Sequence, residues 1–155
     1  MDIREASSVF LRLFGAYPGT WAAAGGWAVD LYLNRPTREH EDFEVIVLRE
    51  ERELLYSEIG NYGPQKILGD PPQFLPWRGE AFEPELIQLR LDPQRVGAGR
   101  EFDLLLTPSD GPHWICRRHE GLRRPLSEVV LSTPSGVPAL APEIVLLFKA
   151  KYCRG

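Results

Sequence analysis

Hydrophobic residues recur along the chain at two different spacings. Near the N-terminus they return every three or four residues, which is the spacing of an amphipathic helix, and they are Val9, Phe10, Leu13 and Phe14. Residues 42–48 (DFEVIVL) and 101–107 (EFDLLLT) are instead short apolar runs with charged residues at alternate positions near their start. Such alternation is typical of strands that face a core on one side. The pattern predicts an N-terminal helix and two similar strands.

The rest of the chain is divided into short elements by glycine and proline. Residues 69–80 (GDPPQFLPWRGE) concentrate both residue types and are predicted to form a loop or flap. Further strands are expected at residues 21–24, 65–68, 85–91, 113–118 and 128–132, and further helices at about 27–33, from 49 towards 63, and from 142 onward. This order predicts an α+β fold with a mixed or antiparallel sheet and helices packed on one side.

Length and charge exclude several classes of protein. The 155 residues, 43% of them hydrophobic, fit a single domain over 1–155. The net charge of -4 argues against tight, charge-driven binding of nucleic acid, which needs an excess of clustered Lys and Arg. The N-terminal helix carries charges among its apolar residues, so neither a signal peptide nor a membrane anchor is expected. Cys116 and Cys153 form no CxxC pair, which predicts neither a thiolate zinc site nor a disulfide framework and favours the cytoplasm.

The two charged strands suggest a metal site. Asp42 and Glu44 point to one face of their strand, with Cα atoms about 6.5–7 Å apart, and Glu101 and Asp103 repeat this arrangement. If the strands are neighbours, three or four carboxylates converge, which is unfavourable unless a cation neutralises them. Oxygen-only ligands suit Mg²⁺ together with substrate phosphates. A pair of such ions is the usual clamp for in-line displacement at phosphorus.

Two adjacent glycines suggest a phosphate site. Gly25 and Gly26 lie between a predicted strand and a predicted helix. Without Cβ atoms, their backbone N–H groups can approach a phosphate at the positive end of the helix. A Gly-Gly pair before a helix is commonly only a turn, but here a D-x-E strand follows it closely.

These motifs together resemble a known enzyme superfamily. GGWAVD (residues 25–30), RPTREH (35–40) and DFEV (42–45) are similar to the signature of the DNA polymerase β-like nucleotidyltransferases, and most similar to the small bacterial group of aminoglycoside 2″-nucleotidyltransferases. The later segments EFDLLLTPSDGPHWICRR and GVPALAPEIVLLFKAK also resemble that group. The resemblance spans most of the chain and implies the nucleotidyltransferase fold. It also implies that relatives continue beyond residue 155 with a charged segment and a helix.

The resemblance implies transfer of a nucleoside monophosphate from an NTP, such as ATP, to a hydroxyl group with release of pyrophosphate. Gly25 and Gly26 would hold the triphosphate, and Asp42 and Glu44 would bind Mg²⁺, with two ions expected. Asp103 would be the third metal-binding and catalytic carboxylate and could take the proton of the acceptor hydroxyl. Glu101 is its rival for that position.

Other residues near these motifs have both a functional and a structural interpretation. Arg38, His40 and Lys149 are candidates for nucleotide binding. Alternatively, Arg38 pairs with a neighbouring glutamate, His40 forms a structural hydrogen bond, and Lys149 is solvated near the end of the last helix. Asp30 is expected to act as a cap or to pair with Arg35 or Arg38 rather than to contact the nucleotide.

Three classes of function stay open at this stage. The first is an active nucleotidyltransferase acting on a small molecule, a protein or a tRNA. The second is an inactive nucleotide-binding or regulatory module of the same fold, such as one half of a toxin–antitoxin pair. The third is a metal hydrolase that uses His40, Asp42 and Glu44 together. The fold and the nucleotide chemistry do not identify the acceptor.

Overall fold

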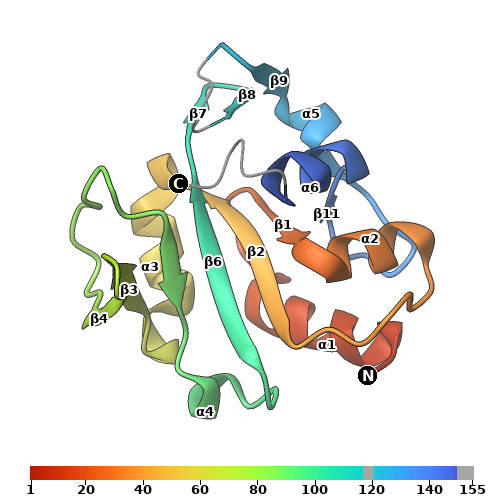
Figure 1. The fold of residues 1–155 in the computed structure, drawn as a ribbon, viewed down its shortest axis with the longest axis horizontal. Coiled ribbons are helices and arrows are strands. Elements are labelled where there is room, and N and C mark those ends of the chain that lie inside the picture. Colours follow the sequence, from red (N-terminus) through yellow and green to blue (C-terminus); the bar gives the residue numbers. More distant parts are fainter. Residues whose placement is uncertain (117–120, 150–155) are drawn as a thin grey trace.

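The structure is a computed structural model that describes residues 1–116 and 121–149. Its described residues form a large mixed sheet of eight strands, in the order β10-β11-β1-β2-β6-β5-β3-β4, and a small sheet in the order β7-β8-β9 (Figure 1). The large sheet contains β1 (Trp21–Ala24), β2 (Asp42–Leu48), β3 (Gln65–Leu68), β4 (Gln73–Pro76), β5 (Gln88–Arg90), β6 (Glu101–Thr107), β10 (Val130–Leu131) and β11 (Ala139–Leu140). The small sheet contains β7 (Ser109–Asp110), β8 (His113–Ile115) and β9 (Arg123–Pro125).

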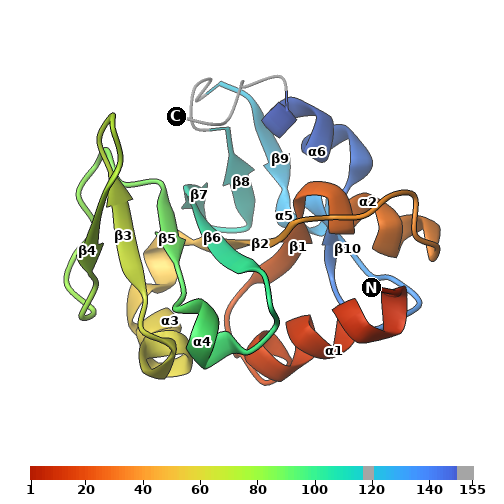
Figure 2. The same cartoon turned by 60° about the horizontal axis from the view of Figure 1, so that its bottom comes forward.

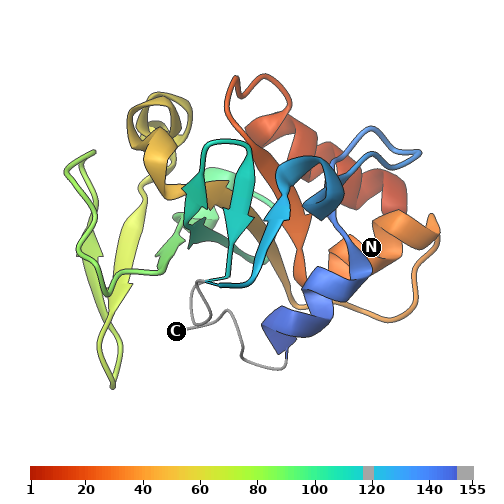
Figure 3. The ribbon, with the colours of Figure 1, turned by 90° about the horizontal axis from the view of Figure 1, so that it is seen from above.

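Helices connect and cover these strands. They are α1 (Ile3–Phe14), α2 (Gly25–Leu33), α3 (Arg52–Ile59), α4 (Pro93–Val96), α5 (Leu126–Val129) and α6 (Pro142–Lys149), with 3-10 turns η1 (Arg49–Glu51) and η2 (Gly60–Tyr62). Figure 2 shows α1 and α3 along the same side of the sheet, and Figure 3 shows α6 beside α2. The predicted α+β architecture with a mixed sheet is confirmed.

The centre of the large sheet is the parallel pair β2 and β6. All seven residues of β2 pair in register with β6, from Asp42 opposite Glu101 to Leu48 opposite Thr107. The pair β1 and β11 is also parallel, and the remaining pairs of neighbouring strands in the large sheet are antiparallel. Paired residues share a face of the sheet, so this register decides which side chains can meet.

Aromatic residues fix which face of the central pair is buried. Phe10 of α1 packs edge-on against Phe43 of β2 and Phe102 of β6, with ring centroids 5.3 and 5.9 Å apart. Trp27 of α2 stacks on Phe43 at 6.1 Å. These side chains are almost completely buried. The helices therefore cover the Phe43 face, and the carboxylates of the alternate positions are left on the other face.

Some elements differ from those predicted. The segment 69–80 contains β4, which pairs with β3 at the edge of the sheet, where the missing N–H of Pro76 is tolerated. Of the predicted strand at 128–132, residues 128 and 129 end the helical turn α5, and only Val130–Leu131 form a strand, β10. The predicted strand at 113–118 ends at Ile115, and residues 117 and 118 lie outside the described part.

Cys116, just after β8, is completely buried. Within the described ranges, no helix is both long and apolar enough to cross a membrane.

The turn between β1 and α2 depends on two glycines for different reasons. Gly25 has a φ of +63°, a left-handed conformation that side chains disfavour. A Cβ on Gly26 would lie 2.3 Å from Nδ1 of His40, so the histidine ring occupies that space. His40 is buried, and Trp27 contacts its ring edge-on at 4.7 Å.

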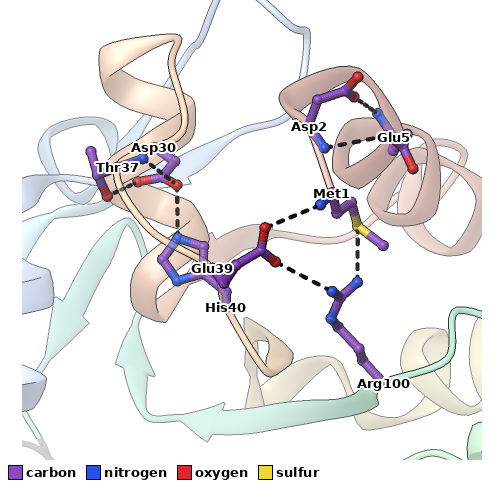
Figure 4. A network of polar contacts seen from close by, with 8 residues as sticks. All are labelled: Met1, Asp2, Glu5, Asp30, Thr37, Glu39, His40 and Arg100. Atoms are coloured by element: carbon purple, nitrogen blue, oxygen red, sulfur yellow. Dashed lines mark hydrogen bonds and ion pairs between the residues drawn. The ribbon is translucent and has the colours of Figure 1, made fainter.

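A buried aspartate holds His40 in place. Nε2 of His40 lies 2.7 Å from Oδ2 of Asp30, which is completely buried (Figure 4). The backbone N–H and the hydroxyl of Thr37 also donate to this carboxylate. Burial alone would raise the pKa of Asp30, but the hydrogen bonds from Thr37 and His40 outweigh it and hold the pKa below its ordinary value of 3.8. Asp30 thus fixes both the loop after α2 and the ring behind Gly26.

The end of the same loop is tied to other parts of the chain. Glu39 lies 3.5 Å from the N-terminal ammonium of Met1 and 3.6 Å from the guanidinium of Arg100 (Figure 4). The loop before β2 is therefore attached to α2 through Thr37 and His40, and to the N-terminus and Arg100 through Glu39.

Removing the aromatic side chain of Phe10 should destabilise the protein strongly. We expect Phe10→Ala to lower the free energy of unfolding by about 3–5 kcal/mol, because the cavity would open beneath Phe43 and Phe102. Leu11→Ala, on the exposed side of the same helix, is the control and should cost about 0.5 kcal/mol or less. Denaturant titration measures both values, and equal losses would contradict the packing described.

The carboxylate of Asp30 should make stability depend on pH. Because its folded pKa is lowered, its contribution is complete above the unfolded-state value near 3.8 and is lost as the pH falls through the folded value. We expect Asp30→Asn to be less stable than the wild type by about 1–3 kcal/mol at pH 6. Denaturant titrations from pH 6 to pH 3 should show this gap closing in the acidic range, and a gap independent of pH would contradict an ionised Asp30.

Candidate active site

Four carboxylates share the open face of β2 and β6. The register places Asp42 opposite Glu101 and Glu44 opposite Asp103. Asp42 and Glu101 are the first residues of their strands and are exposed. Glu44 is half-buried, and Asp103 is only 2% exposed. The sequence-based expectation that these side chains share one side of neighbouring strands agrees with the pairing.

A single arginine, Arg90, contacts two of these four carboxylates. Arg90 of β5 pairs with Asp103 in the register, and its Nε and Nη2 donate to the two carboxylate oxygens at 2.8 and 3.0 Å. Nη2 also lies 2.8 Å from Oε2 of Glu101. The amide of Gln88 donates to Asp103 at 2.6 Å. The hydrogen bond to Asp103 is the main reason why the pKa of Arg90 is raised, and the charges of Glu101 and Asp42 add to it.

Gly25 and Gly26, here called the glycine turn, share a pocket with the carboxylates of Asp42 and Glu44. We call it the glycine pocket. It encloses about 170 Å³ and is lined on its polar side by Gly25, Gly26, Arg38, Asp42 and Glu44. Residues of β6, β11 and α6 form its apolar wall, namely Leu105, Leu140, Val145 and Phe148. The first turn of α2 has no side-chain cap, so its N–H groups and the positive end of its dipole can serve an anion here.

The absent side chain of Gly25 also shapes this pocket. An added Cβ would lie 3.0 Å from Oε2 of Glu44, so the backbone of the turn and the carboxylate lie close together. An anion bound by the turn would repel Glu44 unless a cation lay between them. The arrangement therefore suits a phosphate and a divalent cation bound together.

Two further pockets continue along the same edge of the sheet. One, of about 410 Å³, is lined by Glu41, Asp42, Pro93, Gly99, Arg100 and Glu101. The next, of about 590 Å³, contains Pro93, Arg90, Phe74 and Arg78 among its lining residues. Asp42 is common to the first and second pockets and Pro93 to the second and third. We call these two further pockets the groove; its lining includes Asp42 and Glu101 but neither Gly25 nor Gly26.

The structure separates the other predicted nucleotide-binding residues. Arg38 lines the glycine pocket, and in the described part of the chain it forms no ion pair with Glu39 or Glu41. His40 lies behind the turn, bonded to Asp30, and does not line the pocket. Lys149 is the last residue of α6, and its side chain lies outside the described part. Asp30 binds Thr37 and His40 rather than an arginine.

Sequence reasoning missed Arg90 and Gln88. Both lie at alternate positions of a predicted strand, so a shared face could have been inferred. Their role, however, depends on β5 pairing with β6, which no local pattern indicated.

The donor set fits a magnesium ion at one part of the site. Asp42 and Glu44 offer carboxylate oxygens beside an anion-binding turn, which suits an ion that is shared with substrate phosphates. The two oxygens of Asp103 accept hydrogen bonds from Arg90 and Gln88. Among the residues described, no group of three or more His, Cys, Asp or Glu side chains is placed to hold a metal.

Comparison with known proteins agrees with this geometry. The family model of aminoglycoside-2″-adenylyltransferase matches residues 9–103, from α1 to Asp103. No curated protein matches the chain.

Two solved structures share the fold. The crystal structure of ANT(2″)-Ia in complex with adenylyl-2″-tobramycin has a TM-score of 0.57 at 15% identity, over 96% of this chain and 75% of that one. The lincosamide antibiotic adenylyltransferase LnuA, with lincomycin bound, has a TM-score of 0.59 at 17% identity, over 94% and 84% of the two chains. At such identities the likeness shows the fold, whereas the family match spans more than half of the chain. The chain therefore belongs to the aminoglycoside-2″-adenylyltransferase family and is a nucleotidyltransferase.

Proposed function

We propose that this protein transfers a nucleoside monophosphate from a nucleoside triphosphate, in the first instance ATP, to a hydroxyl group of a small molecule and releases pyrophosphate. The observation that carries the proposal is the pocket in which Asp42 and Glu44 adjoin the uncapped start of α2. A phosphate-binding turn and two carboxylates on one pocket are the parts that phosphoryl chemistry requires.

The triphosphate would be bound by the backbone of the glycine turn. The N–H groups of Gly25 and Gly26 begin α2 and lie on the pocket, and Arg38 supplies a positive side chain there. His40 would act indirectly, because its ring supports the backbone of Gly26 from behind. These contacts would orient the α-phosphorus towards β2.

Asp42 and Glu44 would hold Mg²⁺. When bound, this ion neutralises phosphate charge and favours departure of pyrophosphate. The two side chains extend from the same face of β2, and the half-buried Glu44 restricts how the nucleotide can lie. Asp42→Asn or Glu44→Gln would keep the size of the side chain but remove its charge.

The acceptor hydroxyl would attack from the groove beyond the carboxylates. Its oxygen forms a bond to the α-phosphorus while the bond from that phosphorus to the pyrophosphate oxygen breaks, and the hydroxyl proton goes to a carboxylate. Asp103, directly opposite Glu44 and held by Arg90 and Gln88, is our candidate for that group, and Glu101, which lines the groove, is the alternative. Glu101 lies at the exposed end of the strand.

The groove supports a small-molecule acceptor. Its two pockets, of about 410 and 590 Å³, match the volume of ordinary ligand sites. Tobramycin and lincomycin accompany the two structural neighbours, and both compounds are therefore reasonable first acceptors to test. The set of carboxylates favours turnover over an inactive regulatory module. We also propose the cytoplasm as the compartment, since the reaction consumes a nucleoside triphosphate.

Binding of nucleotide should require the charges of β2. We expect calorimetry to detect ATP binding that depends on Mg²⁺ in the wild type, and the double variant Asp42→Asn, Glu44→Gln to weaken it at least about 100-fold. Glu53→Gln, at an exposed glutamate of α3, is the matched control and should bind as the wild type does. No binding of ATP, GTP, CTP or UTP by folded wild type would refute the proposal.

Transfer itself should appear as an acceptor-dependent release of pyrophosphate. With ATP and a panel that includes tobramycin and lincomycin, we expect a product whose mass exceeds that of the acceptor by one adenylyl group. Asp103→Asn should lower kcat at least about 100-fold while leaving nucleotide binding within about twofold, because its charge acts mainly on the acceptor side. Equal losses of binding and turnover would argue against that role.

A further inference from the structure

Asp103 has little room for a metal ion. An ionised carboxylate offers about four lone-pair positions, and three hydrogen bonds already reach Asp103. Oδ2 accepts from both Nη2 of Arg90 and the amide of Gln88, and Oδ1 accepts from Nε of Arg90. One position, on Oδ1, is left. It can serve a hydroxyl group of the acceptor, but not a hydroxyl and a metal ion at once.

Arg90 is held at Asp103 from several directions. Its guanidinium binds the two oxygens of Asp103 as a planar fork and reaches Glu101 with the same Nη2. On its other side it lies over the ring of Phe74 in β4, 5.5 Å from the centroid. A bidentate pair of this kind is geometrically specific, and the contact with the ring adds a cation–π attraction.

These contacts place a permanent positive charge beside the third carboxylate. A divalent cation bound there would stand next to the guanidinium and be repelled by it. Asp42 and Glu44 line the glycine pocket, on the other strand of the central pair. Asp103 thus lies in a part of the site that already contains a cation.

We propose that Arg90 takes the place of a second metal ion, so that the protein works with a single divalent cation held by Asp42 and Glu44. The inference rests on the proposed function, because it concerns the nucleotide-bound site. It replaces the expectation of two ions drawn from the sequence. In this arrangement the guanidinium keeps Asp103 ionised and aligned beside the acceptor hydroxyl, while the one ion stays with the triphosphate.

The number of bound ions tests the proposal directly. Mn²⁺ is titrated into the wild-type protein saturated with α,β-methylene-ATP, and free Mn²⁺ is followed by electron paramagnetic resonance. We expect one tightly bound Mn²⁺ in each protein–nucleotide complex. Two tight ions in the wild type would overturn the inference while leaving the proposed function intact. A wild type that binds no analogue would overturn the proposed function itself.

Three variants identify the guanidinium as the cause. Arg90→Gln should bind a second Mn²⁺ at least about tenfold more tightly than the wild type does. Arg90→Lys, which keeps a positive charge, should bind a single ion. Arg12→Gln, at an exposed arginine of α1 that lines none of the described pockets, should match the wild type. A single ion in a folded Arg90→Gln protein, judged by its thermal transition, would contradict the assignment.

Discussion

The residue-for-residue parallel pairing of β2 with β6 is the constraint on which the rest of the structure depends. It stacks Phe43 on Phe102 beneath α1, and the same alternation sends Asp42, Glu44, Glu101 and Asp103 to the opposite face. A slip of one residue would bury the charges and expose the rings. The hydrophobic core therefore aligns the charged groups, and carboxylates that repel one another are held together by packing on the far side of the sheet.

The glycine turn shows how a buried polar group can support a functional backbone. Asp30 has no contact with the pocket, yet it sets the position of the His40 ring, and that ring fills the space where Gly26 lacks a side chain. The backbone at Gly25 and Gly26 therefore packs against the His40 ring on one side and faces the pocket on the other. Rigidity of this kind lowers the cost of binding, because the N–H groups need little reorganisation when a phosphate arrives.

Local patterns predicted much of this fold. Strands at 21–24, 42–48, 65–68 and 101–107 have the expected limits. These limits are predictable because the alternation of apolar and polar residues, and the glycine and proline residues that end an element, are signals within a short stretch of sequence. The glycine pair and the D-x-E strand are equally local, and the structure places them on one pocket. Arg90 escaped notice because its importance arises from a contact with a strand that is distant in sequence. His40 was ambiguous for the same reason, as its partner Asp30 belongs to the preceding helix.

The two edges of the large sheet carry a consequence for how the protein behaves among its own copies. An edge strand exposes unpaired backbone groups to which another chain can add. Here one edge is β10, which has only two residues, and the other is β4, which has four and ends at Pro76. Short edges and a proline offer few consecutive donors and acceptors to an incoming strand. The wide sheet that carries the charged centre is thus a poor template for growth by strand addition, although Phe74 and Leu75 are exposed on its outer strand.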